Sequence, residues 1–269
     1  MLTHDRHQKI LETLVAQQTA SVLQLSEKLQ VSSATIRTDL NHLARYGHIV
    51  RTHGGARIGK ERVRQEYTFA TRQETNADKK QAIARLAATL IEPRDSILLD
   101  ASSTAVALVT AIKQRIDLHN LTVVTTGIWT ALELLGSQDI NVVLTGGTVR
   151  STSGSISGQI TLETLSKINL NKVFLGAAGL SESAGATDTH LIEIELKQAI
   201  VKQAEQVILL VDSSKWGKTS LATFAELPQI STIVTDEEAP VAMIRMFRKK
   251  GIDVRIAEHV KNGKKKNNG

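Results

Sequence analysis

The sequence predicts an α/β protein made of a small, mostly helical domain followed by a larger domain with a doubly wound, mostly parallel sheet. Two observations point to this fold class. Apolar residues recur every three to four positions through residues 22–43, which is the helical period. From residue 96 onward, short β-branched runs alternate with helical stretches, as in chains that form a parallel sheet covered by helices on both faces.

The first elements expected are two consecutive helices between residues 21 and 45. Ser21 is a suitable cap for the first helix, and Ser32 or Ser33 for the second, because a serine side chain accepts from the unpaired N–H groups of a helix start. Each helix has one apolar face that can bury against the other. The inward residues are Val22, Leu25 and Leu29 in the first helix and Ile36, Leu40 and Leu43 in the second, with Val31 closing the first.

The outer face of the second helix presents hydroxyl, amide and basic side chains. Such groups hydrogen-bond base edges and phosphates in the major groove of DNA. The alternative is a small helical bundle whose outer face is only solvated. The residues of this helix expected to contact DNA are Ser33, Thr35, Arg37, Thr38, His42 and Arg45.

A short basic hairpin, HIVRTHGGAR, is expected next, at residues 48–57. Gly54 and Gly55 permit a sharp turn. Two helices followed at this distance by a basic hairpin are the parts of a winged helix-turn-helix, so the hairpin favours DNA binding over a plain bundle. The wing is expected to contact DNA through Arg51, His53 and Gly54. The alternative for His53 is that it is only a turn residue without a DNA contact.

The larger domain begins after a polar, partly helical linker at residues 58–75. Seven runs that are apolar on both faces predict buried strands, and helical patterns between them predict the layers on either side. The strands are expected at residues 96–100, 121–126, 140–146, 172–178, 206–212, 231–236 and 252–257, with helices starting near Asp78, Thr104 and His190.

Several of these strand ends lead into hydroxyl residues or glycines at helix starts, as in Ala101-Ser102-Ser103-Thr104. In open parallel sheets, ligands bind beyond the carboxyl ends of the strands, and unpaired N–H groups at helix starts favour phosphate. Serine and threonine are also ordinary helix caps, but their recurrence at one sheet edge favours a phosphorylated or polyhydroxy ligand. Lys215 can supply a positive charge, and Asp100, Asp188 or Asp212 can bind sugar hydroxyls.

The motifs resemble those of the DeoR family of bacterial transcriptional repressors, from about residue 5 to residue 256. VSSATIRTDLNHLARYGHIVRTHGGA resembles the family's DNA-binding domain, and LLDASSTAVAL, VVLTGGTVR, VFLGAAGL and VILLVDSSKWGK resemble its sensor domain. The resemblance implies a fold like that of ribose-5-phosphate isomerase and a sugar-phosphate ligand. Carried over by position, it implies ligand contacts from Asp100, Ser102, Ser103, Thr104, Thr126, Gly127, Gly146, Gly147, Gly179, Asp188 and Lys215.

Composition and charge bound the remaining possibilities. The chain has 269 residues, no cysteine and a net charge of +6, with +5 in residues 1–64, +7 in residues 245–269 and −6 between them. A basic N-terminal domain beside an acidic larger domain indicates that the N-terminal domain alone contacts the phosphate backbone of DNA. We expect no metal site, cofactor, signal peptide or membrane span, and therefore a cytoplasmic protein. The basic stretch 258–269 is expected to be a disordered tail that is either simply solvated or adds nonspecific DNA affinity.

The resulting expectation is a repressor of a sugar-metabolism operon that a phosphorylated sugar releases from its operator. Repeated half-sites in an operator call for a homo-oligomer, a dimer or a tetramer. One alternative is a sugar-phosphate isomerase or deaminase-like enzyme with an appended DNA-binding head, in which Asp100 and Lys215 imitate a base and a proton donor. A nucleoid protein is a third class, but such a protein has no need of a small-ligand domain.

Overall fold

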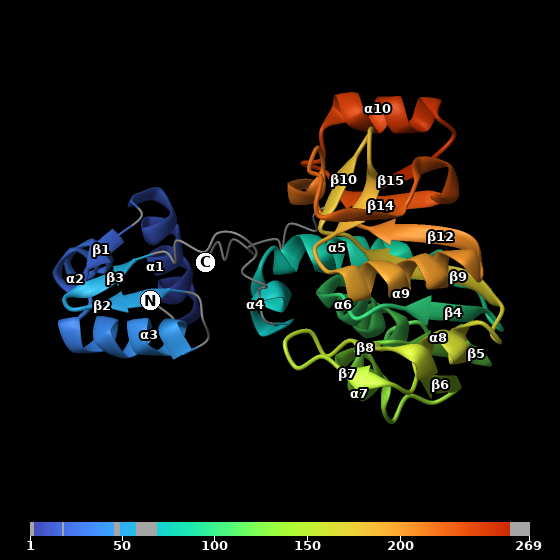
Figure 1. The fold of residues 1–269 in the computed structure, drawn as a ribbon, viewed down its shortest axis with the longest axis horizontal. Coiled ribbons are helices and arrows are strands. Elements are labelled where there is room, and N and C mark those ends of the chain that lie inside the picture. Colours follow the sequence, from blue (N-terminus) through green and yellow to red (C-terminus); the bar gives the residue numbers. More distant parts are fainter. Residues whose placement is uncertain (1–2, 18, 46–48, 58–68, 259–269) are drawn as a thin grey trace, which may run out of the picture. The chain divides into compact units, whose positions relative to one another are not determined.

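The computed structural model describes residues 3–17, 19–45, 49–57 and 69–258 (Figure 1). The chain divides into two compact units, Met1–Thr68 and Phe69–Gly269. Most of the expected linker and nearly all of the expected basic tail lie outside the described residues. No helix in the described part of the chain is both long enough and apolar enough to cross a membrane.

The first unit is a three-helix domain with a small antiparallel sheet in the order β1-β3-β2. Its core contains the residues expected from the helical period, since Leu25, Ile36 and Leu40 are fully buried and Leu43 nearly so. The winged helix-turn-helix arrangement is therefore confirmed. Its elements are α1 (Thr3–Gln17), β1 (Thr19–Ser21), α2 (Val22–Leu29), α3 (Ser33–Arg45), β2 (Val50–Thr52) and β3 (Gly55–Arg57).

The helix ends of this unit are set by short polar interactions. Ser21 caps α2 in a capping box with Gln24, as expected. Helix α2 ends at Leu29 because Gln30 adopts a left-handed conformation, one residue before the expected closing position. The side chain of Ser32 accepts from the backbone N–H of Thr35 at 3.1 Å, so Ser32 rather than Ser33 is the polar cap before α3.

The second unit is built on a seven-stranded sheet in the order β15-β14-β12-β9-β4-β5-β6, and every neighbouring pair is parallel. All seven expected strands are present in it. They are β4 (Ser96–Leu99), β5 (Leu121–Thr125), β6 (Ile140–Leu144), β9 (Leu170–Gly176), β12 (Ala204–Leu210), β14 (Thr232–Asp236) and β15 (Asp253–Ala257).

Helices cover both faces of this sheet, which confirms the doubly wound α/β class (Figure 1). Within β4, Ile97 and Leu99 point into the core under α5 (Ala77–Ala88) and α6 (Ser103–Lys113). Leu98 points into the opposite core, with α9 (Leu191–Lys202) and α10 (Val241–Lys249). This alternation along a strand explains why the strand sequences are apolar on both faces.

The second unit also has several short elements. A helix after Gly127 and helical structure in the linker were expected from the sequence, and the others were not. An antiparallel sheet, β10-β11-β13, packs beside α9, and β7 pairs with β8. Helix α4 lies within the segment expected to be linker, but it belongs to the second unit and lies against α6. The elements are α4 (Phe69–Glu74), α7 (Ile128–Leu134), β7 (Thr148–Val149), β8 (Ile156–Ser157), α8 (Gln159–Leu165), β10 (Gly179–Ser181), β11 (Gly185–Asp188) and β13 (Ala222–Ala225), with single turns η1 (Ser213–Lys215) and η2 (Leu227–Gln229).

Candidate functional site

Helix α3 of the first unit presents an exposed polar face. Arg37, Thr38 and His42 are exposed, whereas Thr35 is half-buried and shares a hydrogen bond with the Ser32 hydroxyl at 2.8 Å. The Thr38 hydroxyl donates to the backbone oxygen of Ala34, so part of its capacity is used within the helix. Ser33 is half-buried at the start of α3, and Arg45 ends it.

A buried ion pair fixes this helix to α1. Arg6 donates to both carboxylate oxygens of Asp39, at 2.6 and 3.0 Å, and His7 lies 2.9 Å from the same carboxylate. Burial alone would raise the pKa of Asp39, but the hydrogen bonds from Arg6 and His7 outweigh it and hold that pKa below its usual value. The His7 ring also lies 5.0 Å from that of His42, centroid to centroid. The sequence alone did not indicate this anchor.

The wing is held close to the helices by its backbone. A Cβ added at Gly55 would lie 2.1 Å from the backbone oxygen of Ala20, so the close approach of β1 and β3 requires glycine there. Gly54 is exposed and accepts from the backbone N–H of Val22 at 2.8 Å. The Arg51 guanidinium donates to the backbone oxygen of Gly55 at 2.7 Å, which braces the hairpin, while His53 is exposed at its tip.

In the second unit, the predicted Asp100 lies at the carboxyl end of β4 and organises the first loop. Its carboxylate accepts from the backbone N–H of Ser102 at 3.0 Å and from that of Gly176 at 2.9 Å. The Ser102 hydroxyl caps α6 by accepting from the N–H of Ala105, and Ser103 and Thr104 are buried in the first turn. The expected capping role of these hydroxyl residues is thus present.

Lys197 of α9 joins two of the predicted acids. Its ammonium group donates to Asp188 at 2.7 Å and to the backbone oxygen of Gly176 at 2.7 Å, and it lies 3.3 Å from Asp100. Burial would lower the pKa of Lys197, but the charges of Asp188 and Asp100 raise it well above its usual value. Burial likewise opposes ionisation of Asp188, yet Lys197 holds the pKa of that acid below normal. Lys197 and Asp188 are therefore both charged near neutral pH.

The remaining predicted loops have separate surroundings. Thr126 is buried and its backbone oxygen accepts from Ile156, while Gly127 lies against Ala101 of the first loop. Gly146 and Gly147 pack against α8 and β8, and Gly179 packs against residue 218. These glycines allow close backbone approach at each of these positions.

A second group of charged residues surrounds the loop after β12. Asp212 accepts from the Asn76 amide at 3.1 Å and from the backbone N–H of Ser214, and Lys215 is half-buried in η1. Burial lowers the pKa of Lys80 to about 8, with the charge of Lys215 acting in the same direction and that of Asp212 opposing it. Lys80 donates to the backbone oxygen of Thr75 at 2.5 Å. Lys80 and Lys197 are thus buried lysines that were not among the expected site residues.

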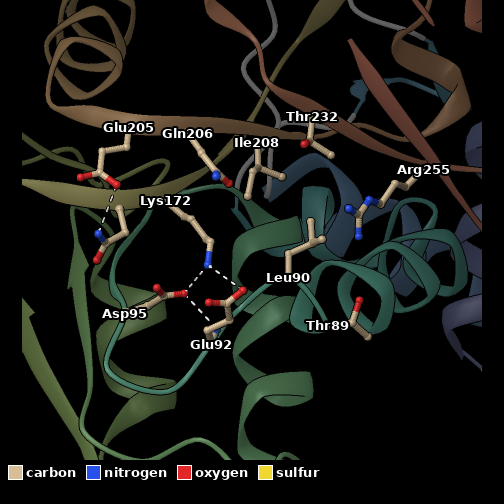
Figure 2. Close-up of a pocket in the computed structure, with 11 residues that line it drawn as sticks. Thr89, Leu90, Glu92, Asp95, Lys172, Glu205, Gln206, Ile208, Thr232 and Arg255 are labelled. Atoms are coloured by element: carbon tan, nitrogen blue, oxygen red, sulfur yellow. Dashed lines mark hydrogen bonds and ion pairs between the residues drawn. The ribbon is translucent and has the colours of Figure 1, made fainter. Parts of the chain in front are cut away.

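A separate cavity of about 440 Å³ lies at the opposite, amino ends of the strands (Figure 2). It contains none of the predicted ligand residues. Its buried Lys172 is paired with Asp95 at 2.7 Å and lies 3.9 Å from Glu92, so the lysine charge is compensated within the protein (Figure 2). The cavity is therefore distinct from the edge where the predicted acids converge.

Both units match one family of known proteins. Residues 6–62 match the family model described as the DeoR-like helix-turn-helix domain, and residues 75–237 match the DeoR C terminal sensor domain. The chain belongs to the DeoR family. The HTH-type transcriptional regulator GolR of Listeria innocua, a member by sequence, is 36% identical over 259 residues, or 96% of this chain and 100% of the relative.

Two further relatives carry repressor names. The glycerol-3-phosphate regulon repressor of Escherichia coli is 31% identical over 90% of this chain and 94% of its own length. The HTH-type transcriptional repressor GlcR of Bacillus subtilis is 32% identical over 96% of this chain and 98% of its own. Among solved structures, ribose 5-phosphate isomerase A from Methanocaldococcus jannaschii is 19% identical, with a TM-score of 0.40 over 52% of this chain and 55% of that chain.

Proposed function

We propose that this DeoR-family protein is a transcriptional repressor of a sugar-metabolism operon and that a phosphorylated sugar releases it from its operator. The observation that carries the proposal is the match of one chain, over both its units, to a DNA-binding and a sensor domain. Relatives aligned over nearly their full length are named as regulators and repressors, one of them of a glycerol-3-phosphate regulon.

The first unit supplies the means of reading DNA. Arg37 and His42 stand exposed on α3, and the opposite face of that helix is buried. We assign base or phosphate contacts to Ser33, Thr35, Arg37, Thr38, His42 and Arg45, and backbone contacts to Arg51, His53 and Gly54 of the wing. The Arg51 bond to Gly55 uses one guanidinium nitrogen and leaves others to donate. Repeated half-sites imply a homo-oligomer.

The second unit supplies the sensor. The carboxyl edge of the sheet brings Asp100, Ser102 and Asp188 together around Lys197, with Lys215 on the neighbouring loop. We assign ligand contacts to this edge, including Ser103, Thr104, Thr126, Gly127, Gly146, Gly147 and Gly179. Carboxylates and hydroxyls bind sugar hydroxyls, and the basic groups bind phosphate.

The enzyme alternative needs a free carboxylate base near its substrate. Asp100 is only 2% exposed, and its oxygens are engaged by two backbone N–H groups and by Lys197 rather than by Lys215. A general base must reach the proton that it abstracts, and these contacts hold the Asp100 carboxylate among donors of the protein instead. The geometry therefore favours binding over proton abstraction, and we propose that the protein is not an enzyme.

Fluorescence anisotropy tests the proposal directly. Labelled DNA from upstream of the gene is titrated with protein, beside a scrambled duplex, with and without a panel of sugar phosphates. We expect selective binding to the upstream DNA that one compound weakens at least tenfold. Uniform binding to both duplexes, or turnover of a sugar phosphate, would contradict the proposal.

Two variants separate the two activities. Arg37→Ala should weaken operator binding at least tenfold without changing ligand affinity, since each base or phosphate contact contributes roughly 1–3 kcal/mol. Lys215→Ala should leave operator binding intact and blunt the response to ligand. The exposed Lys218 provides the matched control for the second variant, because Lys218→Ala should respond as the wild type does.

A further inference from the structure

We propose that Arg72 of α4 receives the anionic group of the effector, and that ligand binding thereby acts directly on the helix from which the chain continues to the DNA-binding domain. The inference rests on the proposed function and adds to it a specific residue and a route of regulation. Arg72 was not among the residues expected from the sequence.

The Arg72 guanidinium has unused donors. Its Nε and Nη2 atoms are buried and make no hydrogen bond within the part of the chain that the structure describes. Buried donors on a charged group are costly to leave unpaired, so such atoms call for an explanation. In contrast, the buried Lys172 and Lys197 are both paired with carboxylates. Arg72 therefore has two N–H groups with the fork geometry that binds an oxyanion in a two-point fashion.

Arg72 also lies at the sensor site. Its backbone oxygen accepts from the hydroxyl of Ser103, in the first predicted loop, at 3.2 Å and from the Lys80 ammonium group. The charge of Arg72 contributes to lowering the pKa values of both Lys80 and Asp188. The guanidinium therefore lies within electrostatic reach of the lysine group and of the acid group of the site.

The surrounding charges favour an anion. Arg72, Lys80 and Lys215 bring three basic groups to this part of the edge against the carboxylate of Asp212, while the nearby Asp100 and Asp188 are already compensated by Lys197. The group recognised is therefore an oxyanion, either a phosphate monoester or a carboxylate. A phosphate oxygen pair and a carboxylate oxygen pair both fit a guanidinium fork.

Helix α4 connects this anion site to three parts of the sensor edge and to the preceding chain. The Phe69 ring stacks on Trp129 of α7 with centroids 5.5 Å apart, and the Arg72 guanidinium lies over the same Phe69 ring at 5.8 Å. The backbone N–H of Phe69 donates to Thr152 at 2.9 Å. Helix α4 lies beside α6 (Figure 1), and it is the first described element of the second unit.

A ligand anion that pairs with Arg72 therefore binds the first helix of the sensor domain, and the stability of that helix depends on the ligand. A ligand shifts an equilibrium only through a different affinity for the two states. The state with α4 held by the anion is the one we assign to low operator affinity. Substitution of the Arg72 guanidinium should therefore prevent the anion from weakening operator binding.

The test compares full-length wild type, Arg72→Gln and Arg72→Lys with the control Arg85→Gln, which changes an exposed arginine on the neighbouring α5. Calorimetric titrations use glycerol 3-phosphate, glucose 6-phosphate, fructose 1-phosphate and gluconate, each with its neutral parent, and inorganic phosphate. The gluconate arm distinguishes a carboxylate from a phosphate. Anisotropy on the operator duplex is measured with the same proteins, and circular dichroism confirms that each variant is folded.

For whichever anion binds the wild type, Arg72→Gln should weaken binding roughly ten- to hundredfold, as expected for loss of a charge-assisted pair. Its affinity for the neutral parent and for the operator should stay within about twofold of wild type, and the anion should no longer release DNA. Arg72→Lys should be intermediate, and it serves as the test if Arg72→Gln is unfolded.

The inference is overturned if the Arg72 variants bind the anion as tightly as Arg85→Gln does, or lose anion and neutral parent equally. It is also overturned if the wild type binds no anion, inorganic phosphate included. A wild type that binds an anion through Arg72 but does not release DNA would instead contradict the proposed repressor function and the coupling, and would leave the anion site supported.

Discussion

At the scale of single residues, Lys197 holds Asp100 and Asp188 together by charge. Lys197 is 6% exposed, and its ammonium group lies between the carboxylates of Asp188 and Asp100. Lys197→Met would leave two buried carboxylates without a counter-charge, and breaking a buried pair in this way costs about 3–5 kcal/mol. We expect this loss in urea unfolding at pH 7.5, followed by tryptophan fluorescence, because both tryptophans lie in the second unit.

The pH dependence of that loss follows from the pKa shifts. In the wild type, Lys197 lowers the pKa of Asp188, so its stabilising contribution is present above the unfolded pKa of about 4 and is lost as the pH falls through the lowered value. In the variant, Asp188 lacks the charge that lowers its pKa, so it takes up a proton more easily as the pH falls. The difference in unfolding free energy between the wild type and Lys197→Met should therefore narrow toward pH 4. An equal loss from Lys202→Met, on the exposed end of α9, would contradict this account.

Asp39 has the equivalent role in the DNA-binding domain. Its side chain is 4% exposed and paired with Arg6. Asp39→Asn should destabilise this unit by about 3 kcal/mol, which lowers hydrogen-exchange protection of α1 and α3 roughly a hundredfold. Because the pKa of Asp39 is lowered in the fold, this stabilisation is present above about pH 4 and is lost below it.

The control for Asp39 is Glu27→Gln, a change of the same kind on the exposed face of α2. Hydrogen-exchange protection of α1 and α3 in Glu27→Gln should equal that in the wild type. If exchange in α1 and α3 were unchanged in Asp39→Asn at neutral pH, the buried pair would not be what fixes α3 to α1.

At the scale of elements, the wing depends on the close approach of β1 and β3. Gly55→Ala would place a methyl group 2.1 Å from the Ala20 oxygen, which forces the strands apart at a cost of about 1–3 kcal/mol. Gly54→Ala is a matched control, since nothing lies within 4 Å of a Cβ at that position. Operator anisotropy and thermal unfolding should both be impaired by Gly55→Ala, whereas Gly54→Ala should leave thermal unfolding little affected. If Gly55→Ala unfolded at the same temperature as Gly54→Ala, the wing would tolerate a wider spacing of β1 and β3.

Long or strongly patterned elements could be predicted from the sequence. The strand around Val123 and Val124 is apolar on both faces because it is buried on both, and Ile36 and Leu40 follow the period of a helix buried on one face. The short strands β10, β11 and β13 could not be predicted, because they have three or four residues of ordinary loop composition. They depend on tertiary packing, since β11 and β13 lie against α9 and β10 pairs with β11.

The candidate site was only partly predictable for a related reason. Asp100 and Ser102 follow a strand directly, where the topology itself places a ligand edge. Lys197 lies in the middle of a helix, where a lysine is usually solvated, and Arg72 lies in a segment whose polar composition is typical of a linker. Only the tertiary structure brings these two cations to the predicted acids.

At the scale of the whole molecule, release from DNA by a ligand requires that the sensor and the DNA-binding domain be thermodynamically coupled. If a sugar phosphate weakens operator binding by some factor, the operator must weaken sugar-phosphate binding by the same factor. This reciprocity depends on both units of the full chain and on no assumption about their arrangement. It distinguishes a switch from a protein that merely carries two independent binding sites.

The most direct test is calorimetric titration of the releasing sugar phosphate into the full-length protein, alone and saturated with operator duplex. We predict that operator weakens ligand binding at least tenfold, matching the weakening of operator binding by saturating ligand, and that Arg37→Ala with the same duplex shows no such effect. Equal ligand affinity with and without operator, in a protein that binds both, would contradict the central claim that one chain couples sugar-phosphate binding to release from DNA.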